Sequence, residues 1–184
     1  MTDATPQSLA LQRIRADVRA MHAYAVHDAT GYLKMDAMEN PFGLPPALQA
    51  ALGQRLGQLA LNRYPGTRQN DLKAALAAHA LAPEGSALIL GNGSDELIGL
   101  VQLACARRDA SGPAKVLAPA PGFVMYAMCA QQHGLQYVGV DLDGEFQLRE
   151  QAMLDAIAEH RPALTFLAYP NNPTGTLWDA GTIA

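Results

Sequence analysis

The sequence predicts an α/β fold in which a mainly parallel sheet is flanked by helices in three layers and preceded by an N-terminal arm. The first observation is the alternation, from residue 87 onward, of short apolar runs with stretches of helical spacing. Strands that alternate with helices of about 10 to 15 residues are typical of βαβ units, whose strands run parallel. The second observation is that 49% of the 184 residues are hydrophobic, which is enough for the core of one domain.

The spacing of apolar residues also predicts the individual elements. We expect a short basic helix over 9–21, within an arm of residues 1–45, and then helices over 47–61 and 67–81. A proline pair at the start of the first of these two helices suits its first turn. The alternating part is expected to form strands at 87–90, 115–119, 135–142 and 163–169, and helices at 94–106, 122–134 and 148–160. Residues 46–184 follow this arm.

Composition argues against several classes of function. The formal net charge is -4, and the basic residues are scattered along the chain, which gives nucleic-acid binding little support. The two cysteines have no CxxC spacing and the histidines show no ligand spacing, so we expect neither a disulfide framework nor a metal site. No apolar run approaches the roughly 18 residues of a membrane-spanning helix, and the N-terminus is too polar for a signal peptide. We therefore expect a soluble cytoplasmic protein.

Three loops at predicted strand ends are the candidate site, because ligands of parallel sheets bind outside the carboxyl ends of the strands. In the first loop, "GNGSDE" at 91–96, the glycines form a tight turn and Ser94 lies at or near the start of a helix. Free backbone N–H groups, the helix dipole and the Ser94 hydroxyl together suit a phosphate group. An ordinary glycine turn with a serine cap is the simpler alternative.

The other two loops carry an aromatic ring and a pair of asparagines. "PAPGF" ends at Phe123, whose ring can stack on a planar ligand or pack in the core, and Tyr126 one turn later is expected to form buried wall. "PNNPTG" at 170–175 holds Asn171 and Asn172 in a turn that Pro173 fixes. A plain turn needs only one asparagine, so the doubled asparagine indicates a binding role.

These motifs, in this order, resemble the fold-type I pyridoxal-phosphate aminotransferases, and among them the histidinol-phosphate aminotransferases. The stretches that carry the resemblance are "VRAMHAY" (18–24), "MDAMENPFG" (35–43), "LNRYPG" (61–66), "GNGSDELI", "PAPGFVMY" and "YPNNPTG". The resemblance runs from about residue 13 to the last residue. It implies that residues 46–184 are the first part of the large domain of these enzymes, with the remainder and the C-terminal small domain absent. It also implies that the arm, residues 1–45, contributes to the small domain and the substrate side.

The resemblance also implies a cofactor, pyridoxal 5'-phosphate, and a role for each matching residue. Phe123 would stack on the pyridine ring, Asn172 would bond its phenolic oxygen, and Tyr64 would reach the partner's cofactor phosphate across a homodimer interface. The residues assigned to the cofactor phosphate, mostly through backbone N–H groups, are Gly93, Ser94, Asp95 and Glu96. The residues assigned to the substrate side, near its imidazole end, are Tyr24, Glu39 and Asn40.

Two features depart from the family pattern. Gly122 replaces a hydroxyl-bearing residue beside the ring, so a side-chain hydrogen bond there is lost. The lysine that forms the internal aldimine in this family lies in a Ser/Thr-rich loop, and Lys34, Lys73 and Lys115 lie elsewhere. We therefore expect these residues to be the N-terminal half of a longer enzyme, with no catalytic lysine, inactive alone and with exposed apolar edges.

For the intact enzyme, the resemblance implies transfer of an amino group from L-histidinol phosphate to 2-oxoglutarate in histidine biosynthesis. The products are imidazole acetol phosphate and glutamate, so the partners are a phosphorylated amino compound and a 2-oxo acid. Two alternatives remain open. One keeps the fold but changes the substrate, as in a threonine-phosphate decarboxylase or an aromatic aminotransferase. The other is a fragment that binds pyridoxal phosphate or a partner without catalysis.

Overall fold

The computed structural model describes residues 6–22, 28–34, 39–64, 66, 68–110 and 112–184. The chain divides into two compact units, one formed by Met1–Met21 with Ile89–Ala184 and the other by His22–Leu88. We describe each unit by itself. The predicted domain boundary between residues 45 and 46 stays a prediction.

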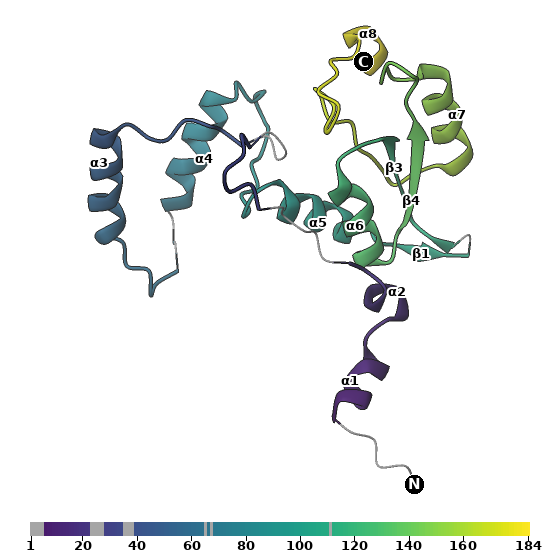
Figure 1. The fold of residues 1–184 in the computed structure, drawn as a ribbon, viewed down its shortest axis with the longest axis horizontal. Coiled ribbons are helices and arrows are strands. Elements are labelled where there is room, and N and C mark those ends of the chain that lie inside the picture. Colours follow the sequence, from purple (N-terminus) through teal and green to yellow (C-terminus); the bar gives the residue numbers. More distant parts are fainter. Residues whose placement is uncertain (1–5, 23–27, 35–38, 65, 67, 111) are drawn as a thin grey trace. The chain divides into compact units, whose positions relative to one another are not determined.

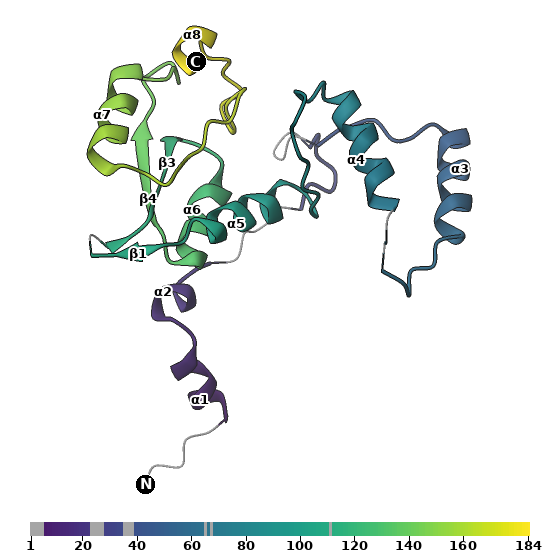
Figure 2. The ribbon, with the colours of Figure 1, turned by 180° about the vertical axis from the view of Figure 1, so that it is seen from behind.

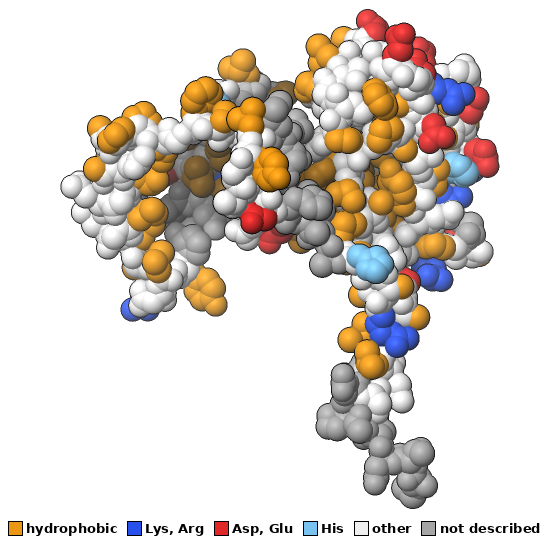
Figure 3. Space-filling view, in the orientation of Figure 1, with side chains coloured by type: hydrophobic (Ala, Val, Ile, Leu, Met, Phe, Trp, Pro, Cys, Tyr) orange, Lys and Arg blue, Asp and Glu red, His pale blue; other side chains and the backbone are white. Residues whose placement is uncertain are grey.

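The unit of residues His22–Leu88 carries two of the predicted helices, α3 (Pro46–Gly57) and α4 (Arg68–His79). Pro46 occupies the first turn of α3. Backbone N–H groups there have no acceptor within the helix, so the N–H that proline lacks costs no helical hydrogen bond. Leu48, Leu52 and Leu56, spaced four residues apart along α3, are each 42–51% exposed. Hydrophobic side chains therefore gather on the surface of this unit, over α3 and α4 (Figure 3).

The other unit contains a three-stranded parallel sheet in the order β4-β3-β5, which confirms the predicted fold class. Its strands are β3 (Lys115–Ala120), β4 (Gln136–Asp141) and β5 (Leu164–Thr165). In register, Val116 of β3 faces Tyr137 on one side and Leu164 on the other. Residues 116–119 are all buried, and successive side chains of a strand point to opposite faces. Both faces of the central strand β3 are therefore covered.

Helices α6 (Val124–His133) and α7 (Glu150–His160) follow β3 and β4 and lie on different sides of the sheet in both views (Figures 1 and 2). Helix α6 ends at Gly134, whose φ of 73° is the left-handed conformation that glycine adopts readily. Val116, Ala130 and Leu135 form the core between α6 and the sheet. Helix α5 (Ser94–Ala104) packs against α6 rather than against a strand. The helices predicted at 94–106, 122–134 and 148–160 are confirmed.

The basic helix predicted at 9–21 is two helices, α1 (Pro6–Arg13) and α2 (Ala16–Arg19). Arg15, between them, donates hydrogen bonds to the main-chain oxygens of Gln131 (2.7 Å) and Gln132 (2.9 Å) in the last turn of α6. A cation there satisfies carbonyls that the helix leaves free and complements its dipole. Arg15 also pairs with Asp17, and this hydrogen bond lowers the pKa of the Asp17 carboxyl.

Two details differ from the sequence prediction. The strand expected at 87–90 makes no strand pairing among the described residues, and the boundary between the two units falls within it. A strand needs a ladder partner as well as an apolar run, and Ile89 is 72% exposed. Conversely, a short antiparallel pair, β1 (Arg108–Asp109) and β2 (Gly112–Pro113), was not predicted.

The segment after the third loop is anchored to the same unit. Trp178 is 2% exposed, and its Nε1 donates to the main-chain oxygen of Phe146 at 3.0 Å. The short helix α8 (Ala180–Ile183) begins at Asp179, whose side chain accepts from the main-chain nitrogens of Gly181 and Thr182. In the part of the chain that the structure describes, every helix is too short or too polar to cross a membrane.

Candidate functional site

The first loop leads into the N-terminus of α5. Gly93 directly precedes the helix with a φ of 86°, and a Cβ built on it would meet no atom within 4 Å. The space beside Gly93 is therefore open, and no side chain caps the N-terminus of α5, where an anion would bind to the first-turn N–H groups. Ser94, Asp95 and Glu96 are exposed in this turn, as the prediction of a ligand-accessible loop requires.

The two carboxylates of this turn are directed differently. The Glu96 carboxylate turns back on the loop and accepts hydrogen bonds from the main-chain nitrogen and the side-chain amide of Asn92. Gly91 leaves room for this arrangement, because a Cβ there would lie 2.9 Å from Glu96 Oε2. The Asp95 carboxylate accepts from the Ser94 hydroxyl at 3.4 Å. Burial raises the pKa of the Cys129 thiol, and the Asp95 charge adds to the shift. The Glu96 carboxylate is therefore held by Asn92, and the Asp95 carboxylate lies beside the Ser94 hydroxyl.

The second loop joins β3 to α6 and ends at Phe123. Phe123 directly precedes the first turn of α6 and is half-buried. Its ring meets the ring of Tyr126 edge to face, with centroids 5.6 Å apart, and Tyr126 stacks on Phe166 at 4.5 Å. Tyr126 is 8% exposed, which confirms the prediction that its side chain is buried. Burial raises the pKa of Tyr126. Phe123 keeps partly exposed ring surface, so stacking on a ligand stays a prediction.

The structure explains the glycine in this loop. A Cβ built on Gly122 would lie 2.4 Å from the main-chain oxygen of Pro119, well inside van der Waals contact. Gly122 therefore lets the backbone fold back on the end of β3, a path that a residue with a side chain could not follow unchanged. The departure from the hydroxyl-bearing residue of the family pattern has this local steric reason.

In the third loop, the two asparagines have different environments. Asn171 is 1% exposed and its amide donates to Thr174 Oγ1 at 2.8 Å and to the main-chain oxygen of Pro121 at 3.2 Å. Asn172 is half-buried, and its side chain has no hydrogen-bond partner among the described residues. Asn171 therefore builds the loop, whereas the amide of Asn172 is available to a ligand, and its bond to a cofactor stays a prediction.

One hydrogen bond joins the third loop to the second, and another joins the helices that follow the first and second loops. Asn171 ties the third loop to Pro121 in the second, and Gln102 of α5 donates through Nε2 to the main-chain oxygen of Tyr126 in α6 at 3.1 Å. Sequence reasoning assigned Gln102 no role and treated Asn171 only as one of the paired asparagines. A polar residue within the apolar pattern of α5 was the available signal for Gln102, and the doubled asparagine was the signal for Asn171.

The remaining predicted residues belong to the other unit, His22–Leu88. Tyr64 is 98% exposed. Glu39 pairs with Lys34 at 3.5 Å, and Asn40 Oδ1 accepts from the main-chain nitrogen of Phe42 at 3.0 Å. Tyr24 lies outside the described residues. The roles assigned to these four residues stay predictions.

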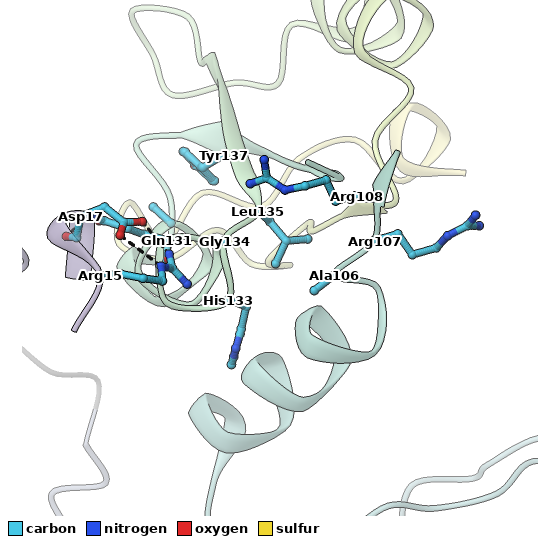
Figure 4. A pocket seen from close by; sticks show the side chains of 11 residues that line it. Arg15, Asp17, Ala106, Arg107, Arg108, Gln131, His133, Gly134, Leu135 and Tyr137 are labelled. Atoms are coloured by element: carbon cyan, nitrogen blue, oxygen red, sulfur yellow. Dashed lines mark hydrogen bonds and ion pairs between the residues drawn. The ribbon is translucent and has the colours of Figure 1, made fainter. Parts of the chain in front are cut away.

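A cavity of about 600 Å³ lies elsewhere in the sheet unit, between the segment of Arg15 and Asp17 and the end of α6 (Figure 4). None of the residues that line it belongs to the three loops. Arg15 is already engaged by Asp17 and by the α6 carbonyls, and Arg107 extends away from that pair. The basic side chains do not converge on one point, so this cavity is not the candidate site.

Comparison with known proteins identifies the class. The sequence profile of the family "Aminotransferase class I and II" matches residues 30–184. The chain therefore belongs to the family of class I and II aminotransferases.

Within this family, the chain is similar to histidinol-phosphate aminotransferases. It is 74% identical over 183 residues to that of Acidovorax ebreus (strain TPSY) and 66% identical over 183 residues to that of Paracidovorax citrulli (strain AAC00-1). Both alignments cover 100% of this chain and 49% of the relative. The chain spans about half the length of the curated relatives it matches.

Solved structures confirm the fold. The chain is similar to histidinol-phosphate aminotransferase from Sinorhizobium meliloti in complex with pyridoxal-5'-phosphate, with a TM-score of 0.71 and 24% identity over 93% of this chain and 46% of that one. It is similar to the histidinol-phosphate aminotransferase from Clostridium acetobutylicum, with a TM-score of 0.63 and 23% identity over 78% of this chain and 39% of that one. At these identities the likeness establishes the fold alone.

Proposed function

We propose that this chain provides the cofactor-binding loops of a pyridoxal 5'-phosphate-dependent histidinol-phosphate aminotransferase. The full-length protein would transfer the amino group of L-histidinol phosphate to 2-oxoglutarate and release imidazole acetol phosphate and glutamate. The observation that carries this proposal is the 74% identity, along all of this chain, to a curated histidinol-phosphate aminotransferase. The three loops at one sheet unit support it.

The loops fit the two chemically distinct ends of the cofactor. The open N-terminus of α5, with Gly93 and Ser94, suits a phosphate dianion through backbone N–H groups and the helix dipole. Phe123 offers partly exposed ring surface to a planar heterocycle, and the unpaired amide of Asn172 can donate to its phenolic oxygen. Asp95 and Glu96 would contribute through their main-chain nitrogens.

In this proposal the residues of the chain bind and orient, and they do not transfer protons. When bound, the cofactor would accept the amino group of the donor and pass it to the 2-oxo acid. The hydrogen bond from Asn172 would stabilise negative charge on the phenolic oxygen. Contact with Phe123 would keep water from one face of the ring.

The test for Asn172 is its replacement by alanine in the full-length protein. A turn tolerates alanine at modest cost, so we expect the absorption spectrum of the bound cofactor to change more than the stability of the fold. Asn171→Ala is the matched comparison, because that buried side chain builds the loop, and it should lower stability as well. An unchanged cofactor spectrum and activity in Asn172→Ala would contradict the assigned role.

We propose further that the full-length protein is a homodimer in the cytoplasm. The exposed leucines of α3 supply an apolar helix face of the kind that subunits bury, and the 98% exposed Tyr64 is free to reach a partner's site. Sedimentation of the full-length protein should give twice the mass of one chain. A monomer that retains full activity would contradict the role of Tyr64.

A substrate series on the full-length protein tests the proposed reaction. L-Histidinol phosphate, phenylalanine and threonine phosphate are supplied in turn with 2-oxoglutarate, and glutamate and carbon dioxide are measured. We expect kcat/KM for L-histidinol phosphate to exceed that for phenylalanine by roughly 100-fold. Faster turnover of phenylalanine would indicate an aromatic aminotransferase, and release of carbon dioxide from threonine phosphate would indicate a decarboxylase.

A further inference from the structure

We infer that two buried amide side chains, Asn171 and Gln102, are positioning residues that hold the Phe123 loop in register with the two loops beside it. They are the buried polar side chains of the described residues, at 1% and 0% exposure. The inference rests on the proposed function, because the register it concerns is that of the phosphate, the ring and the phenolic oxygen of one cofactor.

Asn171 connects the third loop to the second. Within its own turn, its main-chain nitrogen donates to the Thr176 oxygen at 2.9 Å and its main-chain oxygen accepts from the Gly175 nitrogen at 2.8 Å. Its amide nitrogen uses one donation on Thr174 Oγ1 and the other on the main-chain oxygen of Pro121, 50 residues earlier. The turn that presents Asn172 is therefore fixed to the backbone two residues before Phe123.

Gln102 connects α5 to the chain on the C-terminal side of Phe123. Its Nε2 donates to the main-chain oxygen of Tyr126, three residues after Phe123, while its Oε1 is buried without a partner among the described residues. Burying an amide oxygen without a donor is unfavourable, and a leucine would fill a similar volume without that cost. The use of glutamine here therefore points to the one bond it makes.

Both bonds end on main-chain oxygens that flank Phe123. A bond to the main chain fixes the path of the loop, whereas a bond to a side chain would fix only a rotamer. Because Gln102 belongs to the helix that begins at Ser94, its bond sets the position of the proposed phosphate-binding end of α5 relative to the ring of Phe123. Because Asn171 directly precedes Asn172, its bonds set the donor to the phenolic oxygen relative to the same ring.

The alternative is that the two amides serve only the stability of the fold. The two roles predict different effects of Gln102→Leu on the melting temperature and on cofactor binding. A purely stabilising amide would lower the melting temperature and leave cofactor binding unchanged. A positioning amide would weaken cofactor binding and disturb the ring orientation in a protein that melts at the wild-type temperature or above, because the unpartnered oxygen is removed as well.

The experiment compares variants of the full-length protein by titration with pyridoxal 5'-phosphate, by the induced circular dichroism of the bound ring, and by melting of the apoprotein. Gln102→Leu should raise the Kd for the cofactor up to about tenfold, the worth of one hydrogen bond, and reduce the induced signal. Gln131→Leu is the matched control, because Gln131 also donates to a main-chain oxygen, that of Asp17, but at the far end of α6. Its Kd should stay within twofold of the wild-type value.

Thr174 provides the test on the third loop without removing Asn171 itself. Thr174→Val loses the oxygen that accepts from the Asn171 amide and should weaken the cofactor complex, whereas Thr174→Ser keeps that oxygen and should behave as wild type. Wild-type Kd and induced signal in both Gln102→Leu and Thr174→Val would overturn the inference. Absence of saturable cofactor binding by the wild type would overturn the proposed function and this inference with it.

Discussion

Replacement of Gly122 by alanine is the most direct steric test of the site's architecture. The added Cβ would lie 2.4 Å from the main-chain oxygen of Pro119, where contacts under 3.0 Å are essentially never seen. The backbone must therefore retreat by about 0.6 Å at the end of β3, a buried strand that cannot move freely. Overpacking of this kind costs about 1–3 kcal/mol, and we expect the free energy of unfolding to fall by that amount.

The assay is urea unfolding of the full-length protein, with cofactor affinity as a second readout because the shift displaces Phe123. Gly144→Ala is the control: its φ is ordinary and a Cβ there meets nothing within 4 Å, so it should raise stability by about 0.4–1 kcal/mol. Opposite signs for the two substitutions are the expected result. Equal stability of the Gly122→Ala and Gly144→Ala proteins would refute the steric reasoning.

Two further substitutions test the packing of the sheet unit and its arm. Leu117 of β3 is fully buried, so Leu117→Ala should lower the free energy of unfolding by about 2–5 kcal/mol, and a loss below about 1 kcal/mol would show that its site can collapse. The hydrogen bond from Arg15 lowers the pKa of Asp17, so the stabilising effect of the ionised carboxyl is present above its unfolded pKa of about 3.9 and is lost as pH falls through the folded pKa. The difference in urea midpoint between wild type and Asp17→Asn should therefore be constant above about pH 5 and shrink as the pH falls below about 4, and parallel curves would contradict the pairing.

The parallel sheet could be predicted because its signals are local. Apolar runs such as those around Val116 and Tyr137 alternate with helical spacing, and the structure pairs them as adjacent parallel strands. The pairing itself is not local. Residues 87–90 have the same apolar character but no ladder partner among the described residues, while the short pair at Arg108 and Pro113 forms with little apolar sequence.

The site was predictable in its residue types but not in its internal support. The order of the motifs singled out Asn172 and Phe123, and the comparisons confirm the family from which their roles were inferred. The burial of Asn171 and its bond to Pro121 join segments 50 residues apart, and no spacing rule reports such a contact. The same holds for Gln102, whose partner lies 24 residues away.

The central claim is that the three loops hold one cofactor molecule. A crystal structure of the full-length protein grown with pyridoxal 5'-phosphate tests it most directly. We predict the phosphate at the N-terminus of α5 beside Ser94, the ring of Phe123 against the pyridine ring, and the amide of Asn172 within hydrogen-bond distance of the phenolic oxygen. A cofactor bound away from α5, or with Asn172 turned from its ring, would contradict the account.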